Sequence, residues 1–519
     1  MKKWWVKLLL AIAAVVILLA VWLSLSSVHS KNGVERYKDQ LRAAGEKLEL
    51  NDVLPPPVDP DKNGLEFFTR AFNSMSPVMN GMLSTNSPSA MRIVAPGKAM
   101  IGWQQPEIIS DYGSSAYRNT WADLDQQLQL GSGVINFLRQ GAERPQLDFQ
   151  LDYGQGAVLL LPHLNKLKQT ALLLSPAALA DLHRGDSASA ATNLHTLLRT
   201  VNAWKDEPVI ISQLVRIAMA QIAVAAQWEF LQGTNITDSQ LAMLQRDWTN
   251  MQFVLPMEQA LLMERAWGAR NIEQLRSSNS PSRTYSSGWG SGSSGGSGGS
   301  GDWLDMLKDM SDSMKRKTSD TLWRVAWSYD DELNLLQGDQ VLVETMRQIH
   351  TNGYFKNALA DRDRRLAALG LDRPGTNWLR NHLHDELAAL GTETVQSLQH
   401  SIERVLACEA ARTMASTAVA LKRYQLRHQS YPKDLSALVP EFLPEVPRDP
   451  VDGHSLRYQV LSDGNFLLYS VGTDGVDNGG DPTAPSGTRS INWLRGRDWV
   501  WPQPATAREV DNFRANPPK

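Results

Sequence analysis

The stretch Pro176-Ala-Ala-Leu-Ala-Asp-Leu-His-Arg-Gly-Asp-Ser187 lies in the most strongly helical part of the chain. Leu and Ala recur at spacings of three and four over residues 162–182 and 187–204, a pattern typical of helices that bury one face. Gly185 can end one helix and Asp186 can begin the next. Ser175 before Pro176 fits a second helix start, so residues 162–182 are predicted to form either two helices or one kinked helix.

Helical patterns continue on both sides and predict a mainly α fold. The intervening residues 74–105 are rich in Ser, Pro, Met and Gly and are predicted to be irregular. Residues 286–301 contain fifteen Gly or Ser in sixteen positions and predict a flexible insertion. Other predicted helices cover residues 27–50, 63–72, 121–139, 209–231, 238–251 and 256–275, with several more within 302–390.

The segment from Leu179 to Asp186, followed by Ala190 and Leu194, is similar to one helical hairpin of a tetratricopeptide repeat. Arrays of such repeats need about three copies to be stable. Because the chain has no regular repeat of this kind, residues 27–392 are predicted to form a single multi-helix domain that contains the Gly/Ser insertion.

The N-terminus carries an uncharged apolar run of eighteen residues, Leu8–Leu25, preceded by Lys2, Lys3 and Lys7. This length is about the minimum that spans a bilayer, and the basic flank predicts a cytoplasmic N-terminus. Residues 1–26 are therefore predicted to be a single-pass transmembrane anchor in a bacterial inner membrane, with the bulk of the chain in the periplasm. Ser24-Leu-Ser26 resembles a cleavage site, which leaves a removed signal peptide as the alternative.

A second informative stretch is Tyr469-Ser-Val-Gly-Thr-Asp-Gly-Val-Asp-Asn-Gly-Gly-Asp481. It holds Asp474, Asp477 and Asp481 among four glycines. Neighbouring carboxylates repel one another unless a cation or solvent lies between them, and hard oxygen ligands on a flexible loop suit Ca²⁺. The ordered spacing of an EF-hand is absent, so an ordinary solvated Asp-Gly turn is the alternative.

Residues 396–495 resemble the soluble C-terminal module of the major pseudopilins of type II secretion systems. The matching features, in order, are a long helix, the Tyr431-Pro432 turn, the Pro447-Arg-Asp-Pro-Val-Asp-Gly453 turn, two strands over 455–461 and 465–471, and the Asp-Gly loop. The resemblance implies a small α+β module over residues 393–519. It also implies calcium ligands at Asp474, Asp477 and Asp481, with Ser470 contributing its backbone carbonyl.

The chain departs from that family at its N-terminus. Pseudopilins begin with a short basic leader, a cleavage glycine and an early Glu, whereas this chain begins Met1-Lys-Lys-Trp-Trp-Val-Lys7 and carries a large unrelated region before the module. The first helix of the module, over 393–428, is too charged to lie in lipid. It is expected to pack on the helical domain through one apolar stripe, formed by Ile402, Leu406, Ala410, Met414, Leu421 and Tyr424.

Signals for enzymatic chemistry are sparse. His382 and Glu386 would share a helix face but have no third ligand, and Ser212 and Ser470 lack the flanking glycines of a nucleophile elbow. The 52 basic and 55 acidic residues are dispersed, which argues against a nucleic-acid partner.

These features predict a non-enzymatic, membrane-anchored extracytoplasmic scaffold or interaction protein. It would contact the lipid bilayer through its first helix and unidentified protein partners through its helical domain. The alternative is an envelope hydrolase with its site in the helical domain, where loops 74–118 and 276–302 could cover a cleft. The candidate residues for that alternative are His163, His183, His195, His382 and His384.

Overall fold

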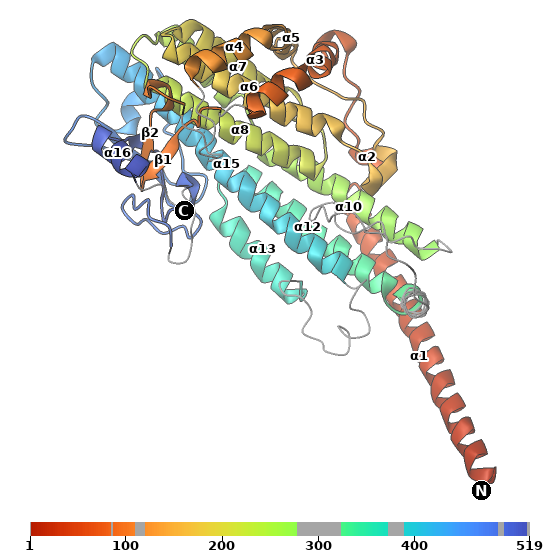
Figure 1. Ribbon diagram of the computed structural model, residues 1–519. Coiled ribbons are helices and arrows are strands. Elements are labelled where there is room, and N and C mark those ends of the chain that lie inside the picture. Colours follow the sequence, from red (N-terminus) through yellow and green to blue (C-terminus); the bar gives the residue numbers. More distant parts are fainter. Residues whose placement is uncertain are drawn as a thin grey trace.

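The structure, a computed structural model, describes residues 2–84, 87–108, 120–277, 323–371, 389–485 and 492–515. The protein is mainly helical with small sheets near the C-terminal part, as the sequence predicts (Figure 1). The helices form an elongated body, and α1 (Lys2–Ala43) projects from one end of it. The strands and α16 (Ala507–Ala515) lie at the opposite end.

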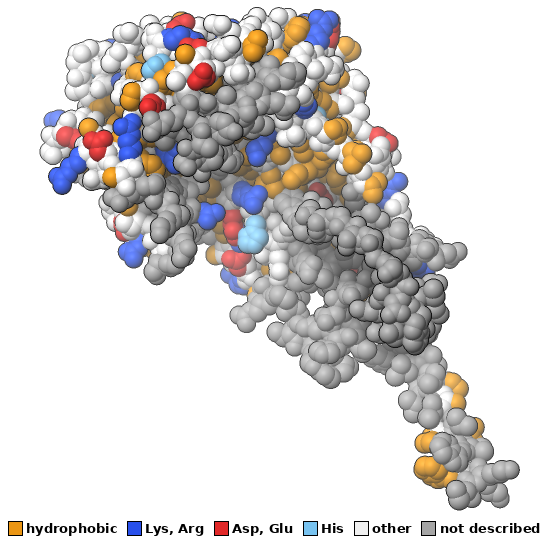
Figure 2. Space-filling view, viewed as in Figure 1, with side chains coloured by type: hydrophobic (Ala, Val, Ile, Leu, Met, Phe, Trp, Pro, Cys, Tyr) orange, Lys and Arg blue, Asp and Glu red, His pale blue; other side chains and the backbone are white. Residues whose placement is uncertain are grey.

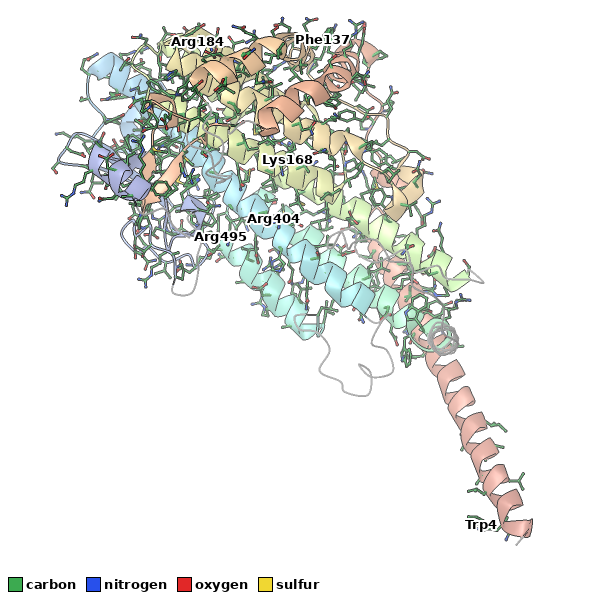
Figure 3. All side chains as sticks on the ribbon, viewed as in Figure 1. Trp4, Phe137, Lys168, Arg184, Arg404 and Arg495 are labelled. Carbon is green, nitrogen blue, oxygen red and sulfur yellow. The ribbon has the colours of Figure 1, made fainter. Side chains whose placement is uncertain are left out.

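The first half of α1 extends away from the body. Its described apolar side chains are largely exposed: Trp4 is 65% exposed, Ile17 63% and Leu18 68%. Figure 2 shows hydrophobic side chains on this projecting end, and Figure 3 shows Trp4 near its tip.

The second half of α1 is held by the body. Val34 and Leu41 are buried, and the helix packs on α12 (Ser328–Asn352). Lys38 Nζ lies 2.5 Å from Glu332 Oε1 and 2.7 Å from Glu273 Oε1. Glu332 is buried and Glu273 is half exposed, and both ion pairs join α1 to the body.

The predicted helical hairpin is confirmed. Residues 162–182 belong to one helix, α6 (Pro162–His183), which continues through Pro176. Gly185 then adopts a left-handed φ of +80°, and the Asp186 side chain accepts a hydrogen bond from Ser189 N to begin α7 (Ser187–Ala203). Local capping signals therefore set this turn.

The core is built around α8 (Ile210–Leu231) and α15 (Ala389–His428). Helices α6 and α7 pack on α8, and α9 (Asp238–Thr249) and α12 pack on α15. The α10 helix (Val254–Ser277) lies along α12. A capping box at Thr237 begins α9.

Within the described part of the chain, α8 is the one helix whose length and apolar composition would allow it to cross a membrane. Two-thirds of its apolar window (67%) is buried inside the body. Trp228 and Phe230 are fully buried, so α8 is accounted for as a core helix.

The expectation that the helix over 393–428 packs on the helical domain is confirmed. It forms most of α15, which contacts α8, α9 and α12. Five of the six predicted stripe residues are buried and Tyr424 packs against the same core. Gln227 of α8 donates a hydrogen bond to the Ala415 carbonyl at 3.2 Å, which joins the two central helices.

The prediction of irregular structure over 74–105 was wrong. The α3 helix continues to Ser84 (Leu65–Ser84), and β1 (Arg92–Ala95) pairs with β2 (Lys98–Met100) as an antiparallel hairpin. The strand β2 then pairs in parallel with β6 (Gln503–Pro504). Because its partner is about 400 residues away in sequence, local patterns could not reveal this strand.

The C-terminal sheet follows the predicted hairpin. Strand β3 (Arg457–Val460) pairs with β4 (Phe466–Ser470), and β4 pairs with β5 (Trp499–Val500). Trp499 and Trp501, on and just after β5, are buried.

Further elements complete the described fold. Two short helices, α4 (Trp121–Leu130) and α5 (Ser132–Ala142), replace the single predicted helix over 121–139. The others are α2 (Leu50–Val53), α13 (Lys356–Ala368), a π-helical turn at Trp323–Trp327, and 3₁₀ turns at Pro60–Lys62, Gly102–Gln104, Tyr153–Val158, Leu435–Leu438 and Trp493–Arg495.

Candidate functional site

The fully buried side chain of Asp449 holds the start of the predicted calcium loop in place. Its Oδ1 accepts hydrogen bonds from Val451 N at 2.9 Å and from Ser470 Oγ at 2.7 Å. Its Oδ2 accepts one from Val471 N at 3.0 Å and lies 3.2 Å from Arg457 Nη1. Asp449 therefore joins the Pro-rich turn to the end of β4. Burial raises the pKa of this carboxyl, against the lowering effect of its hydrogen-bond donors.

A second buried carboxylate, Asp498, lies inside the loop itself. It accepts hydrogen bonds from the backbone N–H groups of Asn478, Gly480 and Asp481, at 2.7 to 3.3 Å. At the start of the loop, Gly472 has φ +67°, and a Cβ there would collide with the Arg497 carbonyl. The chain around 472–481 thus wraps closely against 496–498, and only glycine fits at 472.

The predicted ligands lie on this loop with different partners. Asp474 is exposed and its Oδ1 accepts from Val476 N at 3.0 Å. Asp477 accepts from Tyr469 Oη at 2.9 Å and from Arg457 Nε at 3.3 Å. The N–H of Gly479 also bonds Asp477 and lowers the pKa of its carboxyl.

Asp481 and Ser470 are also engaged. The Oδ1 of Asp481 accepts from Thr483 Oγ1 at 2.7 Å, which lowers the pKa of the carboxyl, and Oδ2 lies 3.6 Å from Arg497 Nη1. Ser470 is buried and its hydroxyl donates to Asp449.

Within the described part of the chain, no group of three or more His, Cys, Asp or Glu side chains is arranged to hold a metal ion. The chemistry of the loop nevertheless fits a hard cation, since three carboxylates and glycine-rich backbone lie on one short segment. Calcium binding by Asp474, Asp477, Asp481 and Ser470 stays a prediction.

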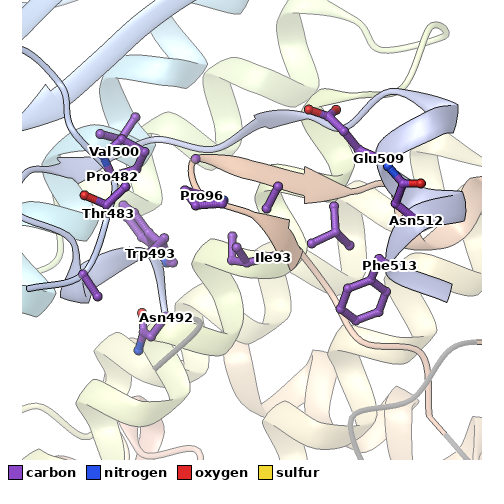
Figure 4. Close-up of a pocket in the computed structure, with 14 residues that line it drawn as sticks. Ile93, Pro96, Pro482, Thr483, Asn492, Trp493, Val500, Glu509, Asn512 and Phe513 are labelled. Carbon is purple, nitrogen blue, oxygen red and sulfur yellow. The ribbon is translucent and has the colours of Figure 1, made fainter. Parts of the chain in front are cut away.

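An apolar cavity of about 600 Å³ lies beside this loop. Figure 4 shows its walls: Ile93 and Pro96 on the β1–β2 hairpin, Pro482 and Trp493 on the C-terminal segment, and Phe513 on α16. Arg92 lies 5.1 Å from the centre of the Phe513 ring. The cavity marks where the hairpin, the loop and the C-terminal helix meet.

The described histidines named for the hydrolase alternative do not form a common cluster. His163 Nε2 is 3.0 Å from Glu207 Oε1, His195 Nδ1 is 2.6 Å from Asp247 Oδ2, and His183 Nδ1 is 2.7 Å from the Trp103 carbonyl. His382, His384 and Glu386 lie outside the described residues.

Ser212 donates its hydroxyl hydrogen bond to Glu207. A nucleophilic serine needs a base that accepts its proton and is itself oriented by a third group. Here the carboxylate stands between Ser212 and His163, so the three residues do not have the order of a hydrolytic triad.

Comparison with known protein families, with curated proteins and with solved structures finds no match to this chain. The pseudopilin resemblance therefore stays a prediction from the sequence. Asp449 and Asp498 were not identified as structural centres of the module, although the Pro447–Gly453 turn was one of its matching motifs.

Proposed function

We propose that the protein is a membrane-anchored, extracytoplasmic scaffold or interaction protein, closed by a calcium-stabilised pseudopilin-like module. The anchor is the first half of α1 and the body lies in the periplasm of a bacterial cell. The resemblance of residues 396–495 directs the search for partners to type II secretion and pilus-like assemblies.

The observation that carries the proposal is the contrast between the two halves of α1. Eighteen uncharged residues at 1.5 Å per residue give about 27 Å, close to the roughly 30 Å hydrocarbon core of a bilayer. The described apolar side chains there are exposed, Ile17 by 63% and Leu18 by 68%, whereas Lys38 joins the following half to the body through two ion pairs. A helix continuous between both halves would hold the body at a fixed orientation to the membrane.

The anchor is tested by substituting two exposed apolar residues of the same helix. Arg at the centre of a span costs about 2.5–3.5 kcal/mol of insertion free energy, so Ile17→Arg is expected to move the protein from the membrane to the soluble fraction. Val28→Arg, beyond the span, is the matched control and is expected to stay in the membrane fraction. A wild-type chain found in the soluble cytoplasmic fraction would refute the anchor.

The mass of the mature protein distinguishes an uncleaved membrane anchor from a cleaved signal peptide. An uncleaved anchor leaves the chain at 57.7 kDa, whereas cleavage after Ser26 removes the whole apolar run. Intact-mass measurement on the purified periplasmic and membrane fractions distinguishes the two.

The calcium module is tested by thermal unfolding of the full chain with Ca²⁺ and with chelator. An ion that binds only the folded state adds about 2.7 kcal/mol of stability at a hundredfold excess over Kd. We expect the midpoint to rise with Ca²⁺ and the rise to be lost in Asp474→Ala, while Asp463→Ala, in the β3–β4 turn, keeps it. Equal unfolding midpoints with Ca²⁺ and with chelator would indicate that the loop is an ordinary Asp-Gly turn that binds no calcium.

A further inference from the structure

The apolar cavity of about 600 Å³ beside the C-terminal loop lies along one edge of a sheet. In the sheet β1–β2–β6, β1 pairs with β2 on one side and with no other described strand on its second side. Five consecutive residues, 93–97, line the cavity. Successive side chains of a strand point to opposite faces of a sheet. A cavity lined by consecutive residues therefore runs along the edge of β1 and is not confined to one face.

A bulge interrupts the pairing of β1 at Val94. Ile93 lies opposite Ala99 and Ala95 lies opposite Lys98, so Val94 has no opposite residue in β2. The unpaired N–H and C=O groups of an edge strand can pair with another extended chain. All four residues of β1 are only partly buried, so this edge is accessible.

The ends of the cavity are aromatic. Figure 4 shows Trp493 towards one end and Phe513 towards the other, with Ile93 between them. Arg92 stacks over the Phe513 ring, 5.1 Å from its centre. Aromatic side chains offer large apolar contact areas, so these walls suit an apolar side chain that enters from the edge of β1.

The charged groups at the cavity are already engaged. Among the described residues that line it, Glu509 is the one charged side chain. Its Oε2 accepts hydrogen bonds from Thr506 N at 2.7 Å and from Thr506 Oγ1 at 2.9 Å. Next to the lining segment, Lys98 Nζ donates to Gln503 Oε1 at 2.7 Å. The site therefore favours an uncharged occupant.

We infer that the free edge of β1 binds an extended, uncharged segment of a partner protein as an additional strand. The backbone of this segment would pair with β1, and one of its apolar side chains would lie between Trp493 and Phe513. The four residues of β1 can pair with a segment of about four residues, roughly 13 Å long. A strand edge beside an apolar cavity favours a peptide over a small molecule, because the edge can hydrogen-bond a peptide backbone along its length.

The inference rests on the proposed interaction role and names the chemistry of one partner. Its test is fluorescence anisotropy of the full chain in lipid nanodiscs, without calcium, so its failure is distinguishable from failure of the anchor or of the calcium module. The probe is a dye-labelled, C-terminally amidated peptide of sequence Thr-Val-Thr-Val-Thr.

The matched probe is the same peptide with every backbone nitrogen methylated, which keeps the side chains and removes all backbone donors. One hydrogen bond makes about a fivefold difference in affinity. Loss of two or more is therefore expected to weaken binding about tenfold or more.

Two variants locate the binding. Val94→Lys places a charge at the strand edge, a device that prevents strand pairing, and is expected to weaken binding about tenfold or more. Phe513→Ala removes one aromatic wall and is expected to weaken it about fivefold. Leu160→Lys, at a side chain that is 79% exposed and lies outside the cavity, is the matched control and is expected to bind like the wild type.

Four outcomes would overturn the inference. Equal affinity for the two peptides would show an apolar pocket that does not bind the backbone. Wild-type affinity in both cavity variants, or no binding at millimolar peptide, would exclude this edge as the site. A wild-type dimer in sedimentation of the detergent-solubilised chain that Val94→Lys abolishes would identify a second copy of this chain as the occupant.

Discussion

At residue 449, one buried carboxylate satisfies two backbone N–H groups and one hydroxyl. Asp449→Ala leaves these three donors without their partner, whereas Arg457 keeps Asp452 and Asp477, so we expect the free energy of unfolding to fall by about 3–5 kcal/mol. Asp474 is exposed and accepts a single hydrogen bond, so Asp474→Ala is expected to cost less than about 1 kcal/mol without calcium. Urea unfolding in chelator compares the two, and equal losses would contradict the central role of Asp449.

Glu229 of α8 is expected to make the stability of the folded protein depend on pH. It is fully buried and its Oε1 accepts hydrogen bonds from Met91 N at 2.9 Å and Gly102 N at 3.0 Å, which hold the β1–β2 hairpin against α8. Burial raises the pKa of Glu229 to about 8, although these donors oppose the rise. Folding therefore favours the protonated carboxyl.

Because the pKa is raised, stability should fall as pH rises from about 4.5, the ordinary value, to about 8. The contribution of this one group is up to about 1.4 kcal/mol per pH unit. Glu229→Gln keeps one oxygen as acceptor and cannot ionise. The unfolding free energy of this variant should therefore fall less steeply with rising pH than that of the wild type. Parallel profiles for the wild type and Glu229→Gln between pH 5 and 8 would contradict the assignment.

At the scale of elements, the crossing of α12 and α15 depends on Gly338. A Cβ at this position would collide with Cγ2 of Val395 and lie 3.2 Å from Leu371 Cδ1. Val395 is β-branched and has little rotamer freedom on a helix, so Gly338→Ala is expected to destabilise the protein by about 1–3 kcal/mol. Gly133→Ala, at an exposed helical position with no atom nearby, should instead stabilise it by about 0.5–1 kcal/mol. Thermal unfolding of the two variants measures whether each substitution lowers or raises stability.

The elements that the sequence predicted well are those whose signals are local. Gly185 and Asp186 set the α6–α7 turn, and the strands predicted at 455–461 and 465–471 pair as the β3–β4 hairpin. Elements defined by distant partners were missed. The β1–β2 hairpin depends on β6 and on Glu229, and burial of Asp498 depends on the loop folding around it. Nothing in the spacing of the acidic residues separates buried carboxylates from exposed ones.

At the scale of the whole molecule, the C-terminal module shares its core with the helical body. Its first helix, α15, is buried against α8, α9 and α12. Trp228 Nε1 of α8 donates to the Pro502 carbonyl at 2.7 Å, and Gln503 N donates to the Gly97 carbonyl at 2.9 Å. The sequence predicts a domain boundary at residue 392, and these contacts join the parts of the chain before and after it.

This shared core predicts how the module behaves when it is removed from the body. A fragment of residues 393–519 would expose the apolar surface that α15 buries in the full chain, at a cost of about 25 cal/mol per Å². We expect the fragment to show no cooperative unfolding transition, and the full chain to unfold with α15 and the C-terminal sheet in one transition. Circular dichroism reports the helices, while near-ultraviolet signals report the packing of the tryptophans, including Trp499 and Trp501. A fragment with a sharp transition of its own would show instead that the α15 contacts are dispensable for the module and that calcium binding can be studied without the body.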